Sequence, residues 1–187
     1  IRSLDSDPGN MRLALDVARE YLRRAEPLAA LEILRRSAEN RPSDYLPQYL
    51  LAEIYFHHLQ DPARAIRYSR KAMALGPGVF APVDLLWTAL AYSGQSSKAS
   101  ALLADVAGNP AGKDARYWLD FAALHRRLPL DGSSTGKANR ERMRDALRRV
   151  RELAGENAEI LAGGGDLAVV SGWPALAVDF YSEAHQL

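Results

Sequence analysis

The segment ALDVAREYLRRAEPLAALEIL, residues 14–34, contains two apolar stripes separated by a break. In its first half, Ala18 and Tyr21 continue a run of small or apolar residues at three- and four-residue spacing, which is typical of one face of a helix. Pro27 follows, and proline favours the first turn of a new helix because no backbone donor is needed there. Ala30 then starts a second stripe of the same spacing. The segment therefore predicts two consecutive helices that pack against each other.

The alanine of the second stripe returns along the chain. The series is Ala30, Ala65, Ala99, Ala146 and Ala177, with separations of 35, 34, 47 and 31 residues. Two separations are close to about 34 residues, a period known for a two-helix repeat. A polar segment at 131–136 supplies most of the excess in the separation of 47 residues, so the chain reads as one helix pair repeated five times.

Strand signals are almost missing, because no stretch alternates apolar and polar residues between turns. Pro, Gly, Asp or Ser interrupts the helical pattern every 12 to 20 residues. Asp7 and Pro8 are expected to start the first helix as its cap and first residue. The predicted helices cover residues 8–24, 27–40, 44–59, 61–75, 80–93, 96–107, 113–127, 138–154, 157–171 and 174–186.

The spacing also matches a known motif. Repeats two and four contain Gln48-x2-Leu51-Ala52-x2-Tyr55 and Trp118-x2-Phe121-Ala122-x2-His125, each followed by an alanine helix at Ala65 or Ala146. With these matches in series, the chain resembles a tetratricopeptide repeat array over residues 8 to 187. The resemblance implies an all-α, right-handed α-solenoid of antiparallel helix pairs, with ten helices. It implies a scaffold for protein binding and no reaction. Trp87 departs from the pattern, because a small residue is usual at its position.

The expected organisation is a single solenoid domain over residues 1–187. Its five repeats are expected at about 8–43, 44–78, 79–111, 112–156 and 157–187, with a loop insertion at 128–137 in the fourth. The chain begins at Ile1, which suggests a mature or excised piece of a longer product. The run Gly163–Asp166 either permits very close helix packing or marks a weak, kinked helix.

The resemblance places the first helix of each repeat on a concave face. Side chains on these helices that lie off the packing stripe are the candidate partner-binding groove. Aromatic and arginine side chains are prominent among them, and these residue types most often carry interface energy. The candidates are Arg12, Arg19, Arg23, Tyr49, Glu53, Phe56, His57, Asp84, Thr88, Tyr92 and Arg116. Leu15, Leu50 and Leu85 stand where a clamp for a terminal carboxylate needs polar groups, which disfavours that mode of binding.

Composition excludes several classes of function. The 24 Lys+Arg residues balance 23 Asp+Glu, so a nucleic-acid partner is not expected. The chain has no cysteine, which removes disulfides, thiolate catalysis and cysteine-based metal sites. No apolar run reaches about 18 residues, so no membrane insertion is expected within this segment.

No catalytic residue, metal site or cofactor is predicted. His57 and His58 are adjacent on a helix and point about 100° apart, so they are poorly placed to chelate together. His125 occupies the packing stripe and is expected in the core. The run Gly132–Lys137 has three residues between its glycines, whereas a phosphate loop needs four and a following Ser or Thr. We expect a flexible insertion there, which is also a candidate contact element.

Two further surfaces leave alternatives open. The arginine-rich segment 140–151 is expected to be a solvated helix. The alternative is that it forms an electrostatic patch for an acidic partner or an anionic polymer. The last helix carries apolar Leu176, Phe180 and Tyr181, and no polar capping helix follows it, so a homo-oligomer through this helix is an alternative.

The function expected from the sequence is a non-enzymatic scaffold that binds a partner protein or peptide through its concave groove. Its expected setting is a larger bacterial assembly of the cell envelope, in secretion or polysaccharide export, in the periplasm or associated with a membrane. The alternative is a regulatory or oligomerisation domain attached to a catalytic or membrane-anchored protein.

Overall fold

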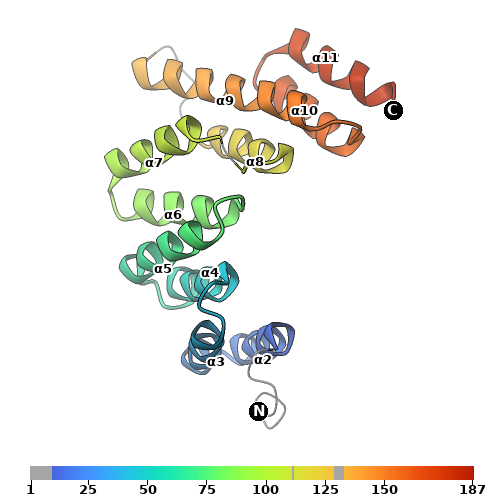
Figure 1. The fold of residues 1–187 in the computed structure, drawn as a ribbon. Helices are drawn as coiled ribbons and strands as arrows, with labels where there is room; N and C mark the ends of the chain where they lie inside the picture. The colour runs from blue at the N-terminus through green and yellow to red at the C-terminus, as the bar shows by residue number, and fades with distance from the viewer. Residues whose placement is uncertain (1–9, 111, 129–132) are drawn as a thin grey trace. The chain divides into compact units, whose positions relative to one another are not determined.

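The computed structural model describes residues 10–110, 112–128 and 133–187. Ten α-helices and one π-helical turn account for most of this part of the chain, and it contains no strand (Figure 1). The all-α prediction is confirmed. The elements are α2 (Met11–Arg23), α3 (Pro27–Asn40), α4 (Tyr45–Glu53), η1 (Ile54–His58), α5 (Pro62–Leu75), α6 (Ala81–Tyr92), α7 (Ser96–Gly108), α8 (Ala115–His125), α9 (Ser134–Leu153), α10 (Ala158–Val170) and α11 (Pro174–His185).

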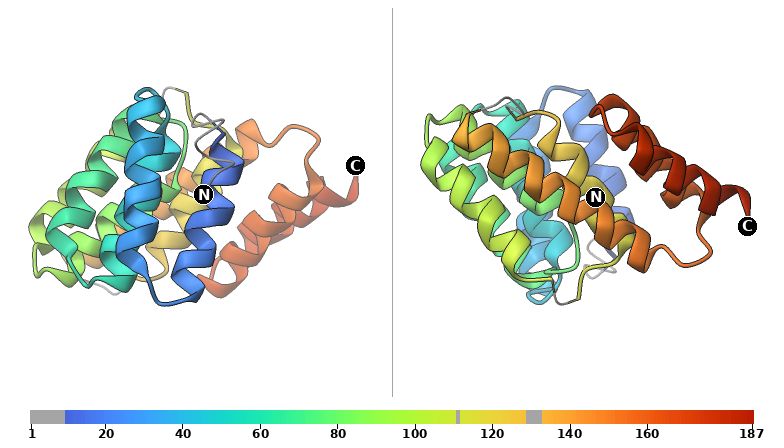
Figure 2. Two further views of the ribbon diagram at one scale, coloured as in Figure 1. Left: turned by 90° about the horizontal axis from the view of Figure 1, so that it is seen from below. Right: turned by 90° about the horizontal axis from the view of Figure 1, so that it is seen from above.

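The chain divides into two compact units, which are described separately. Unit 1 extends to Ala104, and unit 2 runs from Asp105 to Leu187. Within unit 1, α2 packs on α3 and α4 packs on α5, and within unit 2 α8 packs on α9. Helices α10 and α11 form another pair in unit 2, and they lie side by side in Figure 2. Consecutive helices therefore pair as the repeat pattern predicts, and the boundaries of the five repeats stay a prediction.

Side-chain caps explain where several helices begin. An aspartate before α5 and another before α8 each accept a hydrogen bond from a backbone N–H in the first turn, which would otherwise lack a partner. Asp61 accepts from the Arg64 N–H at 2.9 Å, and Asp114 accepts from the Tyr117 N–H at 2.8 Å. The cap of α2 is Asn10. The predicted start at Asp7 and Pro8 lies outside the described residues.

One predicted boundary was wrong. Helix α9 begins at Ser134 and not near residue 138, because the Ser133 hydroxyl accepts from the Gly136 N–H at 3.0 Å and caps the helix. Residues 134–137, predicted as part of a flexible insertion, are the first turn of α9, and residues 129–132 lie outside the described part. The predicted helix over 44–59 changes from α-helical to π-helical hydrogen bonding after Glu53.

Small residues set the distances between helices. The five alanines of the repeat series are all buried, from 0% exposed for Ala30 and Ala65 to 4% for Ala99. A large side chain at these positions would separate the paired helices. In unit 1, Ala30 and Ala65 pack in one cluster with Leu34, Leu51 and Tyr55, and Ala99 packs in another with Leu86 and Leu90.

The glycine run in α10 lies in a continuous helix, so close packing is the alternative that holds. A Cβ added at Gly164 would lie 2.5 Å from the Phe180 ring, and one at Gly165 would lie 2.7 Å from the Tyr181 ring. Both rings belong to α11. Two glycines therefore let the aromatic residues of α11 contact the backbone of α10.

No helix in the described part of the chain is long and apolar enough to cross a membrane.

Candidate functional site

A pocket of about 290 Å³ opens in unit 1 between α2 and the helix formed by α4 and η1. We call it the unit 1 pocket. Its walls are mainly apolar, and its polar lining comes from Arg19, Glu53, His57 and His58. Three of the predicted groove residues therefore lie together. The apolar lining is Leu15, Ala18, Leu22, Leu34, Leu50 and Ile54.

The π-helical turn η1 shapes one wall of this pocket. The Leu59 N–H donates to the Ile54 carbonyl at 3.1 Å, five residues back, so the turn is one residue wider than an α-helical turn. Gln60 then takes a positive φ of 50°, and the Asp61 N–H donates to the Tyr55 carbonyl at 2.8 Å. Turns of this kind occur frequently at functional sites. The wider turn changes the direction of the side chains that follow Ile54.

Two aromatic residues from different helices meet beside the pocket. The Phe56 ring contacts the Tyr92 ring edge to face, with 5.6 Å between centroids. His57 contacts Phe56 with 5.0 Å between ring centroids. A second hollow of about 190 Å³ is lined by these three side chains with Gln60 and Pro62. His57 lines both hollows, and Tyr92 is 69% exposed, so this apolar surface is open to a partner.

A hydrogen bond orients the acid of the site. The Tyr49 hydroxyl donates to the Glu53 carboxylate at 2.8 Å. Burial is the main cause that raises the pKa of Tyr49, and the hydrogen bond to Glu53 and the charge of Asp84 add to it. Tyr49 therefore remains a donor at neutral pH. Asp84 and Thr88 are half-buried, and both make interactions within the protein, so they are less open to a partner than the sequence suggested.

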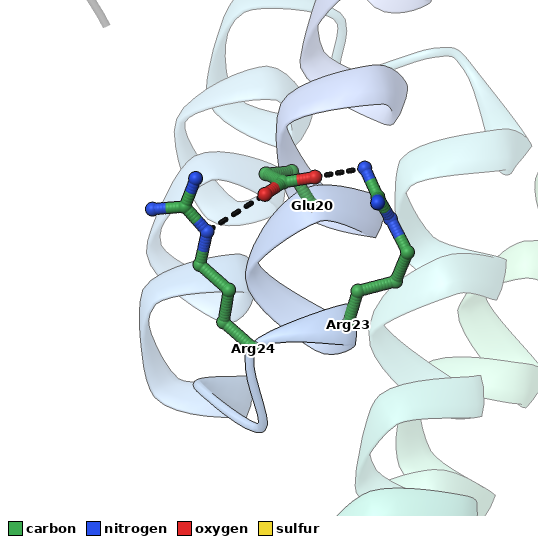
Figure 3. Close-up of polar contacts among 3 residues, drawn as sticks. All are labelled: Glu20, Arg23 and Arg24. Carbon is green, nitrogen blue, oxygen red and sulfur yellow. Dashed lines mark hydrogen bonds and ion pairs between the residues drawn. The ribbon is translucent and has the colours of Figure 1, made fainter.

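Helix α2 presents the three predicted arginines, all of them exposed. Arg19 lies 3.6 Å from the Asp16 carboxylate. Arg23 is paired with Glu20, which also accepts from Arg24 Nε at 2.7 Å (Figure 3). The hydrogen bond from Arg24 is the largest cause that lowers the pKa of Glu20. Glu20 therefore offsets part of the charge of both arginines, and the charge of Glu26 also acts on Arg24. Arg12 also lies on α2 and is exposed.

The last predicted groove residue, Arg116, lies in unit 2. It is exposed on α8, with its Nε 3.4 Å from the Asp120 carboxylate. It therefore belongs to the surface of α8, where an intrahelical ion pair offsets its charge.

His125 is fully buried, as predicted. Its Nδ1 lies 2.9 Å from the Phe121 carbonyl, which fits an N–H donor there, and its ring packs 4.4 Å from the Phe121 ring centroid. Burial lowers its pKa to about 4. A neutral histidine in the core has no access to a substrate. Among the described residues, no group of three or more His, Asp or Glu side chains is placed to hold a metal ion.

Comparison with known proteins places the fold. No family model matches the sequence, and no curated protein matches it. Solved structures do match. A kinesin-light-chain protein of Podospora anserina with nearly identical TPR-like repeats is 14% identical, covers 96% of this chain and 95% of its own, and gives a TM-score of 0.51. YrrB, a TPR protein with an unusual peptide-binding site, is 14% identical, with 99% and 90% covered and a TM-score of 0.50.

MamA of Desulfovibrio magneticus RS-1 is 22% identical, with 94% and 93% covered and a TM-score of 0.47. The two matches with the higher TM-scores span almost the whole chain. The chain therefore has the fold of a tetratricopeptide-repeat α-solenoid, as the resemblance implied.

Proposed function

We propose that this chain is a non-catalytic scaffold whose unit 1 pocket binds a segment of a partner protein. The observation that carries the proposal is the π-helical turn η1, which joins the apolar unit 1 pocket to the exposed contact between Phe56 and Tyr92. Concave apolar hollows with a few polar groups at the edge are typical binding sites. The fold adds support, since exposed surfaces of repeat solenoids serve as binding surfaces.

The chemistry of the pocket defines the partner segment. Leu15, Leu22 and Leu50 line a hollow of about 290 Å³, which suits one large apolar side chain as an anchor. Phe56 and Tyr92, which meet edge to face, add an aromatic surface for a second side chain. The exposed arginines of α2 favour an acidic residue beside the anchor. The proposed ligand is a peptide or helix with an apolar anchor and a neighbouring acid.

A peptide selection tests this proposal. A phage-displayed library of random peptides is selected on the purified chain, and enriched peptides are expected to share a large apolar residue. The triple variant Tyr49→Ala, Phe56→Ala, Tyr92→Ala is expected to lose at least about tenfold in affinity for them, since aromatic residues dominate interface energy. Leu28→Ala is the matched control, because Leu28 is 71% exposed in unit 1 and does not line the pocket. A folded triple variant that keeps full affinity contradicts the proposal.

We also propose a setting for this scaffold, which is a bacterial assembly of the cell envelope, in secretion or in polysaccharide export. A pull-down from the source organism with the native chain and the triple variant tests it. Partners from such an assembly are expected with the native chain only, and partners from another compartment would contradict this setting.

A second candidate function is self-association through α11. Val178 is 63% exposed and Tyr181 is 39% exposed on this helix, and Val169 and Val170 of α10 are more than half exposed. Phe180, in contrast, is fully buried against Gly164 and does not belong to this exposed surface. Sedimentation over a range of concentrations tests the candidate, and a monomer at the highest concentration contradicts it.

A further inference from the structure

Another hollow, of about 720 Å³, lies in unit 2, and its lining differs in chemistry from that of the unit 1 pocket. We call it the Trp118 pocket. Its charged lining comes from α9 and from Lys113, two residues before α8, and its apolar lining includes Trp118. The lining residues are Pro110, Gly112, Lys113, Trp118, Asp145, Arg148, Arg149, Glu152 and Leu153.

Two cations converge on one aromatic ring in this pocket. The Arg149 guanidinium carbon lies 4.4 Å from the Trp118 ring centroid, and Lys113 Nζ lies 5.3 Å from it. Burial is the main cause that lowers the pKa of Lys113; the charge of Asp105 opposes this shift, and the charge of Arg149 adds to it. Two positive groups at one ring create an electrostatic preference for an anion at this pocket.

The hydrogen-bond donors of these groups are only partly used. Lys113 Nζ donates to the Val106 carbonyl at 2.7 Å and also to the Asn109 carbonyl, which leaves one of its three donors. Within the described part of the chain, Arg149 makes no hydrogen bond or ion pair. Its five donors and planar fork suit a carboxylate.

The indole N–H of Trp118 gives an independent observation. The side chain is 1% exposed, and its Nε1 finds no hydrogen-bond partner among the described residues. Buried polar groups normally have a partner, and each exception calls for an explanation. This buried N–H belongs to a residue that lines the pocket, so a ligand bound there changes the surroundings of the indole and can be followed through its N–H signal.

The acids of the pocket limit what the ligand can be. Asp145 pairs with Arg148 at 2.9 Å, so these two charges offset each other. The remaining charges are those of Lys113, Arg149 and Glu152, two positive and one negative. A net single positive charge suits one carboxylate, and the carboxylate of Glu152 repels a dense polyanion.

We propose that the Trp118 pocket binds a carboxylate side chain, an Asp or Glu, in an acidic segment of a partner protein. The carboxylate accepts hydrogen bonds from Arg149 and Lys113, whose positive groups both lie over the buried Trp118 ring. This binding site is independent of the unit 1 pocket, because all its residues lie in unit 2.

The test uses the full chain and a labelled hexaglutamate peptide. Binding is followed by fluorescence anisotropy, and the Trp118 indole N–H signal is followed by nuclear magnetic resonance after assignment with Trp118→Phe. The peptide is expected to shift this signal. Arg149→Gln is expected to weaken binding about tenfold, the effect of losing one charge-assisted hydrogen bond pair. Glu152→Gln is expected to tighten binding. A destabilised variant would lose affinity, so a gain of affinity cannot result from misfolding.

Arg140→Gln is the matched control, since Arg140 is an exposed arginine of the same helix that does not line the pocket. Equal losses in Arg140→Gln and Arg149→Gln would show non-specific attraction to α9 and overturn the proposal. An unchanged indole signal would overturn it as well. Tighter binding of polyphosphate than of hexaglutamate, with the same indole shift, would assign the site to an anionic polymer and also overturn it.

Discussion

The two compact units share one helical-pair design and differ in how their surfaces and cores are built. Unit 1 pairs its helices through alanines such as Ala18 and Ala30 and exposes an apolar pocket beside Phe56. Unit 2 places glycines under the aromatic rings of α11 and exposes a pocket of cations around Trp118. The repeat pattern therefore sets the fold of both units, and the residues at a few positions within it set the chemistry of each unit's pocket.

Buried polar groups show the same contrast. The unit 1 core holds Ser37, whose hydroxyl donates to the Met11 sulfur at 3.2 Å. The unit 2 core holds His125, whose Nε2 has no partner among the described residues. Unit 2 therefore carries a titratable group in its core, and the described histidines of unit 1, His57 and His58, are exposed. The units should respond differently to acid.

The largest expected effect is this response of unit 2 to acid. Burial lowers the pKa of His125 to about 4 from its ordinary 6.5, so the unfolded chain binds a proton that the folded chain refuses. The free energy of unfolding of unit 2 therefore keeps its full value above pH 6.5, where the ring is neutral in both states, and decreases as pH falls from 6.5 towards 4. The full loss is about 3 kcal/mol. Hydrogen exchange with mass spectrometry at several pH values should show unit 2 opening before unit 1.

His125→Gln is the control for this prediction, because glutamine keeps an N–H donor and does not titrate. The variant should lose the extra acid sensitivity of unit 2 between pH 6.5 and 4. An unchanged acid response in the variant would assign the effect to other groups and break this contrast between the units.

The second prediction concerns the glycine packing of unit 2. Gly164→Ala forces a Cβ against the fully buried Phe180 ring, and overpacking of this kind costs about 1–3 kcal/mol. Better helix propensity returns about 1 kcal/mol, so a net loss of up to about 2 kcal/mol in unit 2 stability is expected. Urea denaturation measures it.

Gly163→Ala is the matched control in the same helix. Its Cβ would meet the end of the flexible Leu119 side chain at 3.1 Å, so the propensity gain should dominate and stability should hold or rise. Equal behaviour of the two variants would show that close approach to α11 is not the reason for the glycine at 164.

The smallest expected effect is the loss of one helix cap in each unit. Asp61→Ala in unit 1 and Asp114→Ala in unit 2 each remove a cap that accepts a first-turn N–H. Each should cost about 1 kcal/mol, since capping is a local interaction. Hydrogen exchange in α5 and α8 checks this, and a much larger loss in one unit would show that its cap has a tertiary role as well.

Local signals explain how much of the fold could be read from the sequence. Asp61 and Pro62 predicted the start of α5, because caps and first-turn prolines act within a few residues. Asp114 stands in the same position before α8. The start of α9 was missed, although Ser133 is a good cap residue, because the polar segment around it resembled a loop. The buried His125 was predicted from its place on the apolar stripe.

The candidate site was predicted only in part. Arg19, Glu53 and His57 line one pocket as members of the predicted groove, and Phe56 meets Tyr92 beside it. The π-helical turn η1 has no signal in the sequence, since Ile54–His58 continues the helical spacing of the residues before it. Arg149 was interpreted as one member of a solvated arginine run, and its contact with Trp118 needs residues 31 positions apart in the chain.

The sequence by itself determined the class of fold, the helix pairs and the small residues between them, because spacing, caps and close-packing positions depend on neighbours along the helix. Tertiary structure alone decided the η1 turn, the burial of Phe180 on Gly164 and the choice of Arg149 among the arginines of α9. The physical reason is that burial, and the electrostatic effects that follow from it, depend on which distant segments pack against a residue.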